Sequence, residues 1–215
     1  FQWSEKFRGT NENLFNSPAD WISPSPDGGY LDNPPASDGR KVILSDTDHL
    51  WGIGGNQAWV WKSFCRGMNV LFMDPYHEVG KEGARGDHGT TWTEHLSDTS
   101  KLDQRWDPIR RNMGYTLSYA KRMKLAAAVP SDGLASTKYC LANPGAEYLI
   151  YLPDGGNVTV DLSGALGELD VEWLVPSTGE RVPGGTIDGS VPQELAAPFR
   201  GDAVLYIVAK GASIP

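Results

Sequence analysis

Cysteine, positive charge and long apolar runs are all scarce in this 215-residue chain. Lys and Arg number 19 against 27 Asp and Glu, so the net charge is −8 at pH 7. Such a chain lacks the basic surface with which proteins bind nucleic-acid phosphates or anionic membranes. The longest aliphatic run, residues 125–129, is far shorter than the ~20 residues of a membrane-spanning helix. We therefore expect no nucleic-acid partner and no membrane span.

Cysteine is too rare for a disulfide framework or for a typical zinc site. Cys65 and Cys140 fall within helix-like and strand-like segments, where we expect them to be small buried apolar residues. Asp46, Asp48 and His49 lie close together, but they lack the spacing of a metal-binding motif, and no HExxH or paired CxxC occurs. We expect neither a metal nor another cofactor.

Turn-forming and aromatic residues are abundant, with 25 Gly, 15 Pro and 8 Trp. A hydrophobic content of 40% with 21% charged residues is typical of a globular protein. The chain opens with Phe1-Gln2-Trp3, without an initiating Met or a signal-like segment. We expect either that a leader was removed or that this is a piece of a longer protein, and the organisation of the chain favours the second.

Strand-like and helical segments alternate in the first part of the chain. The apolar runs 41–45 and 69–73 predict two buried strands. Residues 57–66 predict a helix between them, which Asn56 can cap and Gly67 can end. A strand, a helix and a second apolar strand form a βαβ unit with a parallel sheet.

A second, longer helix is expected to begin at Asp107, after a polar loop over residues 77–100. Asp107 offers a capping side chain, and Pro108 suits the first helical turn. The helix should extend for about 17 residues, with one apolar stripe. That stripe is formed by Ile109, Met113, Leu117 and Ala120.

The pattern changes after Pro130 to short strand-like segments separated by turns. Val158, Val160 and Leu162 alternate with polar residues, which is the period of a half-buried strand. The expected strands are residues 135–141, 147–152, 157–162, 171–175 and 203–209. About 85 residues of this kind predict a small antiparallel β-sandwich.

We therefore divide the chain into an α/β part, residues 1–129, and an all-β part, residues 130–215. A complete (β/α)₈ barrel needs about 250 residues, roughly twice the length of the first part. We interpret the first part as the C-terminal portion of a barrel, followed by the β-sandwich.

Acidic residues follow both predicted strands at their carboxyl ends, where barrels and open α/β sheets assemble their active sites. Strand periodicity places Asp46 and Asp48 on one face, about 7 Å apart along the chain. Asp74 ends the next strand in the same way. Glycoside hydrolysis needs such a pair of carboxyl groups. Equally, an Asp at a strand end often caps a turn or a helix.

Aromatic residues near this edge suit the apolar faces of sugar rings. Trp3, Trp21 and Trp51 are candidates for the wall of a cleft. Trp59 and Trp61 lie on the first predicted helix, where we expect core positions instead.

A resemblance to a known family rests on residues 41–76, KVILSDTDHLWGIGGNQAWVWKSFCRGMNVLFMDPY. This segment resembles the late barrel segment of the apiosidase-like, glycoside-hydrolase-type (β/α)₈ proteins. FQW at the start and SPADWISP, residues 17–24, are similar to the preceding barrel segment. Residues 136–164, together with GDAVLYI near the end, resemble the β-sandwich that follows the barrel, a module named as a collagen-binding domain of a collagenase.

The resemblance implies a secreted or periplasmic protein that acts on plant-type or other complex glycans. It also implies a carboxylate nucleophile on a late strand and an acid/base residue on an earlier one. Where the characterised enzymes have Glu, this chain has Asp46-Thr47-Asp48-His49. The acid/base position is expected before Phe1.

We therefore expect a fragment of a glycoside hydrolase that acts on a complex polysaccharide or oligosaccharide and is inactive alone. Asp46 or Asp48 would be the nucleophile or base. Contacts with the substrate are expected from His49, Trp51, Asp74, Tyr76 and Trp3. The alternative is a carbohydrate- or matrix-binding protein with a non-catalytic barrel. In either case the β-sandwich would attach the protein to polysaccharide or matrix, or would brace the barrel.

Overall fold

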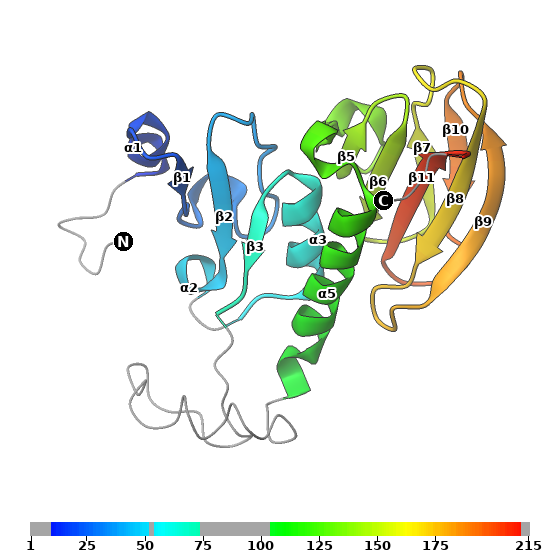
Figure 1. Ribbon diagram of the computed structural model, residues 1–215. Coiled ribbons are helices and arrows are strands. Elements are labelled where there is room, and N and C mark those ends of the chain that lie inside the picture. The colour runs from blue at the N-terminus through cyan, green and yellow to red at the C-terminus, as the bar shows by residue number, and fades with distance from the viewer. Residues whose placement is uncertain (1–9, 52–53, 74–103, 212–215) are drawn as a thin grey trace.

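The computed structural model describes residues 10–51, 54–73 and 104–211. Over these residues the chain is layered (Figure 1). A three-stranded parallel sheet is followed by two helices, a six-stranded sheet and a two-stranded sheet. A separate apolar core fills the space between each layer and the next.

The first sheet consists of β1 (Trp21–Ile22), β2 (Val42–Asp46) and β3 (Asn69–Leu71), in that order and all parallel. With α3 (Gln57–Cys65) between β2 and β3, the expected βαβ unit is confirmed. β3 ends two residues earlier than its apolar run suggested. β1 was not expected, because two residues are too few to show a period. No barrel closes among the described residues.

The ends of α3 are set by its flanking residues, as expected. The Asn56 side chain accepts a hydrogen bond from the main-chain N–H of Trp59 at 2.8 Å. Gly67 follows the helix with a φ of 75°, in the left-handed region that favours glycine. The other short helical segments are α1 (Asn11–Asn16), α2 (Thr47–Leu50) and the 3₁₀ turns Asp27–Gly29, Gln104–Trp106, Leu125–Ala127 and Asp132–Leu134.

The long helix α5 (Asp107–Arg122) is confirmed, but its buried face differs from the expected one. Asp107 is the first helical residue rather than the cap. Ile109 is buried as expected, whereas Leu117 of the expected stripe is 55% exposed. The buried positions are Ile109, Asn112, Thr116 and Tyr119. Two of these residues, Asn112 and Thr116, are polar. Because the expected stripe was chosen from apolar residues alone, it fell on a neighbouring face of the helix.

The remainder of the described chain is antiparallel β structure. Its larger sheet has the order β4-β5-β6-β11-β8-β9, and β10 pairs with β7 in a separate sheet. The strands are β4 (Val129–Pro130), β5 (Cys140–Asn143), β6 (Glu147–Leu152), β7 (Asn157–Val160), β8 (Glu168–Leu174), β9 (Arg181–Asp188), β10 (Gln193–Ala196) and β11 (Ala203–Ala209).

The middle of the six-stranded sheet is buried on both faces. In β6, Tyr148 and Ile150 belong to the core shared with the two-stranded sheet. Leu149 and Tyr151 lie in the core shared with α3 and α5. Because both faces are covered, residues 148–152 of β6 form a continuous apolar run without alternation.

Several expectations for the β part need correction. The strand expected over residues 135–141 begins only at Cys140, and Ala135 makes an isolated bridge to Val160. β9 and β10 were missed, because their exposed residues give little apolar signal. The expected β-sandwich is not confirmed. In the part of the chain that the structure describes, helices cover one face of the six-stranded sheet, and a two-stranded sheet lies on the other. The division after residue 129 stays a prediction.

Candidate functional site at the carboxyl edge of the parallel sheet

The carboxyl ends of the parallel strands form one edge of the first sheet. Side chains of β2 alternate between its two faces. Ile43 lies in the core with Trp59 of α3, and the Ser45 hydroxyl accepts a hydrogen bond from the Trp59 indole at 2.9 Å. Asp46, the last residue of β2, therefore lies on the opposite face, turned away from α3.

Asp46 caps the short helix α2. Its Oδ1 accepts the main-chain N–H of Asp48 at 2.9 Å, and the residue is only 9% exposed. Asp48 lies in the first turn of α2 and is exposed. The expectation that the two share one strand face is wrong, because the chain becomes helical at Thr47. One carboxylate is thus held in place, and its neighbour faces solvent.

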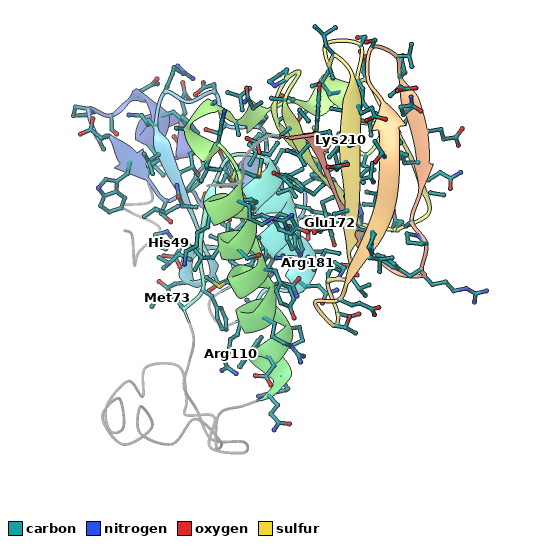
Figure 2. The ribbon with its side chains drawn as sticks, turned by 45° about the vertical axis from the view of Figure 1, so that its right-hand side comes forward. His49, Met73, Arg110, Glu172, Arg181 and Lys210 are labelled. Atoms are coloured by element: carbon teal, nitrogen blue, oxygen red, sulfur yellow. The ribbon has the colours of Figure 1, made fainter. Side chains whose placement is uncertain are left out.

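Hydrogen bonds tie α2 to both neighbouring strands. Nδ1 of His49 lies 2.6 Å from Oγ of Ser23, which directly follows β1. The Thr47 hydroxyl accepts the main-chain N–H of Met73, beyond the end of β3, at 2.9 Å. His49 and Met73 accordingly lie at the same edge of the sheet (Figure 2). The ends of three parallel strands are joined through α2 into one assembly.

Two of these residues, Ser23 and Thr47, were not singled out in the sequence. Ser23 follows a strand too short to recognise, and it contacts a residue 26 positions away. Thr47 lies inside the acidic motif, but its partner is a main-chain amide on another strand. In the sequence, Thr47 could have been recognised as a residue of this edge only from its position between Asp46 and Asp48.

The candidate aromatic residues separate into core and edge. Trp59 and Trp61 are buried, as expected. Trp51 is half-buried and packs edge-on against Trp59, with ring centroids 5.3 Å apart. Trp21 is 61% exposed. The other candidates, Trp3, Asp74 and Tyr76, lie outside the described residues.

The face of the sheet that carries Asp46 is apolar and exposed. Trp21 and Val42 are register partners across β1 and β2, and both are more than half exposed. Leu71 is the register partner of Asp46 on β3, and it too is exposed, as is Met73. Parallel sheets are normally covered on both faces. Here the described residues cover only the face toward α3.

Metal-binding and membrane-spanning features were searched for over residues 10–51, 54–73 and 104–211. In these ranges no group of three or more His, Cys, Asp or Glu side chains is arranged to hold a metal ion. Nor does any helix in them combine the length and apolarity needed to cross a membrane.

The solved structures that resemble this chain include two glycoside hydrolases. One, named "Glycoside hydrolase", has a TM-score of 0.57 at 14% identity over 83% of this chain and 45% of that chain. The other is a glycoside hydrolase family 5 structure from Bacteroides vulgatus ATCC 8482, with a TM-score of 0.58 at 16% identity over 83% of this chain and 44% of that chain. The chain shares the fold of these glycoside hydrolases. By sequence, no protein family and no curated protein matches it.

At such identities the likeness shows the fold alone. The chain spans less than half the length of either structure. The apiosidase resemblance and the collagen-binding label stay predictions, as do the roles expected of Asp46 and Asp48.

Proposed function

We propose that this chain is the C-terminal part of a (β/α)₈ glycoside hydrolase and that the carboxyl edge of its parallel sheet belongs to the glycan site. The observation that carries the proposal is the position of Asp46, at the end of a parallel strand and on the face turned away from the covering helix. In a (β/α)₈ barrel that face is the interior, and active sites lie at the carboxyl ends of the strands. The shared fold with glycoside hydrolases supports this proposal.

The exposed apolar face supports a larger barrel. Trp21, Val42 and Leu71 have the side chains expected inside a barrel, where residues from all the strands fill the interior in layers. We propose that strands from a segment preceding Phe1 cover this face. The same strands would supply the second carboxyl group, which is the proton donor.

Asp46 is our first candidate for the nucleophile or base. The N–H of Asp48 holds its carboxylate in a fixed orientation, which suits a group that must meet an anomeric carbon or a water molecule. Asp48 is the second candidate, because it is exposed beside Asp46. A separation of about 5 Å from the donor carboxyl would mean retention of configuration, and ~6.5–9.5 Å would mean inversion.

Substrate contacts are proposed for His49 and Trp51, which lie at the same edge. Asp74, Tyr76 and Trp3 stay candidates from outside the described residues. The substrate class, a complex polysaccharide or oligosaccharide, and the secreted or periplasmic location stay predictions.

For the β part we propose a bracing role. Its six-stranded sheet packs on α3 and α5, and Asp202 before β11 accepts two hydrogen bonds from Gln57 of α3, at 2.9 and 3.0 Å. Among the described residues after 130, every aromatic side chain is buried or half-buried. Attachment to a polysaccharide through exposed aromatic rings therefore has no support from these residues.

The test uses the full-length parent protein and a panel of glycans, with release of reducing sugar as the readout. Asp46→Ser keeps an oxygen able to cap α2 but removes the carboxylate. We expect it to lower kcat about 10²–10⁴-fold, the usual contribution of a positioned acid or base. Asp48→Asn is compared in parallel. Asp38→Asn serves as the control, because Asp38 is an exposed acid that pairs with Arg40 before β2.

If Asp46→Ser and Asp48→Asn both leave hydrolysis unchanged, the assigned site is wrong. A parent that binds a glycan without cleaving it would support the non-catalytic alternative instead. A parent that neither binds nor cleaves any glycan in the panel would contradict the proposed function.

A further inference from the structure

Thr47 is a fully buried polar residue at the point where β2 ends and α2 begins. A buried hydroxyl normally needs a hydrogen-bond partner, and here the partner lies beyond the end of another strand. Oγ1 of Thr47 accepts the main-chain N–H of Met73 at 2.9 Å, although 26 positions separate the two residues in the chain. Because an N–H can only donate, the direction of this bond is fixed. Thr47 therefore gives the chain that leaves β3 an acceptor on α2.

The bond begins where strand pairing stops. β2 and β3 are paired as far as Asp46 and Leu71. If the pairing continued, the main chain of β2 would also offer acceptors to the residues that follow β3. Instead the Thr47 carbonyl accepts the N–H of Trp51 at 2.8 Å, within α2. The side chain of Thr47 replaces the main chain of β2 as the acceptor, and it keeps the end of β3 beside α2.

The methyl group of Thr47 packs against the loop that leads into α3. A Cβ atom built on Gly55 would lie 3.2 Å from Cγ2 of Thr47, so the methyl group leaves almost no room for a side chain there. Thr47 therefore makes one contact with its hydroxyl and another with its methyl group. A valine would keep the packing but lose the bond to Met73, and a serine would do the reverse.

We propose that Thr47 is a positioning residue for Asp46. The Asp46 carboxylate is oriented by the N–H of Asp48, in the first turn of α2, and Thr47 fixes that turn against the end of β3. Without the bond to Met73, the first turn of α2 can move relative to β3, and the carboxylate moves with it. The part of that carboxylate in glycan cleavage rests on the proposed function, whereas its positioning by Thr47 does not.

The positioning is tested first, by NMR hydrogen exchange of assigned amides in the 215-residue chain. Two N–H groups report on it: that of Met73, which donates to Thr47, and that of Asp48, which orients the nearby carboxylate. In Thr47→Val the protection factors of both groups should fall at least about fivefold, the effect of one net hydrogen bond. Thr47→Ser, which keeps the hydroxyl, should restore both.

Two other amides serve as internal references. The N–H groups of Met68 and Met123 donate to main-chain carbonyls of α3 and α5, so their exchange should stay the same in Thr47→Val. If these amides are accelerated as much as Met73, Thr47 stabilises the whole fold and the positioning role is wrong. The proposal is also overturned if either reporter, Met73 or Asp48, exchanges equally in the wild type and in Thr47→Val.

Glycan hydrolysis by the full-length parent protein is measured separately, at a temperature where every variant is folded. Thr47→Val should lower kcat by up to about 10²-fold, the cost of misplacing a reacting group by about 1 Å. KM should be nearly unchanged, because Thr47 is fully buried and touches no substrate. Thr47→Ser should restore kcat.

Thr116→Val is the matched control for the kinetics. It removes the hydroxyl of another buried threonine, which bonds only within α5, and it should change neither kcat nor KM. If the exchange result holds but the parent cleaves no glycan, the positioning role stands and the proposed function fails. If the parent cleaves a glycan and Thr47→Val has the wild-type kcat, the catalytic role assigned to Asp46 is wrong.

Discussion

Arg122 and Glu172 form a two-point ion pair between α5 and β8. Nη1 and Nη2 of Arg122 lie 2.6 and 3.2 Å from Oε1 and Oε2 of Glu172. The Tyr119 hydroxyl donates to the same Oε1 at 2.9 Å. Arg181 also lies beside Glu172 (Figure 2), with its Nε 3.9 Å from Oε1 of Glu172. The helix layer and the six-stranded sheet are thus joined by charge as well as by apolar packing.

Arg122→Ala should lower the free energy of unfolding by about 1–3 kcal/mol, because it leaves a mostly buried carboxylate with fewer donors. The Arg122 and Glu172 side chains are 19% and 25% exposed. Urea unfolding followed by fluorescence measures the change. Lys210→Ala is the control, since it removes an equally short but exposed ion pair with Glu168 and should have no measurable effect. Equal effects of the two substitutions would contradict this view of the interface.

The contribution of the Glu172 carboxylate to the free energy of unfolding should disappear at acid pH. Burial raises its pKa, but the hydrogen bonds from Arg122 and Tyr119 and the nearby charges outweigh burial and leave the pKa below its ordinary value. A lowered carboxyl pKa stabilises the fold above the unfolded-state value, and that stability is lost as the pH falls through the folded-state value. The difference in unfolding free energy between wild type and Glu172→Gln should therefore be largest near neutral pH and shrink below about pH 4. A difference that stays constant between about pH 7 and pH 3 would show that ionisation of Glu172 contributes nothing.

Asn112→Ala should be strongly destabilising. Asn112 is fully buried, accepts a hydrogen bond from the Trp61 indole at 2.7 Å, and donates to the Pro176 carbonyl at 3.0 Å. Removing its amide leaves the Trp61 indole and the Pro176 carbonyl without this partner. We expect the free energy of unfolding, measured by chemical denaturation, to fall by about 2–3 kcal/mol. The exposed Asn157 offers a comparison, and Asn157→Ala should be close to neutral. A near-neutral Asn112→Ala would mean that water replaces the lost amide.

Neither cysteine should react in the folded protein. Burial raises the pKa of the Cys65 thiol and raises that of Cys140 to about 12. Because the thiolate is the reactive form, a thiol reagent at about pH 8 should modify no residue in native buffer and both in denaturant. Mass spectrometry counts the modified residues. Rapid labelling of either thiol without denaturant would contradict the packing described for α3 and β5.

Gly155→Ala should damage the fold far more than Gly156→Ala. Both glycines have positive φ values, 65° and 73°, so both substitutions carry similar backbone strain. A Cβ at Gly155 would overlap the Gly201 carbonyl oxygen, whereas one at Gly156 meets nothing within 4 Å. We expect the first variant to unfold at a clearly lower urea concentration than the second. Equal midpoints would show that the turn before β11 can shift to admit a side chain.

Predictions from the sequence were wrong where a structural feature depends on residues far away in the chain. Apolar periodicity placed Leu117 on the buried face of α5, but Asn112 is buried instead, because Trp61 on α3 gives its amide a partner 51 positions away. The relation between Asp46 and Asp48 was misread for a local reason: the chain turns helical at Thr47, and a strand period cannot show where the strand stops.

The sequence by itself determined β2, α3 and β3, and the burial of Trp59, Trp61 and both cysteines. Apolar runs, an Asn cap and a glycine stop act over a few neighbouring residues, so they can be read from the chain alone. Only the tertiary structure decided that Ser23 meets His49 and that Thr47 meets Met73. Those contacts depend on which strand ends lie side by side, and that is set by the packing of whole layers rather than by neighbours in the chain.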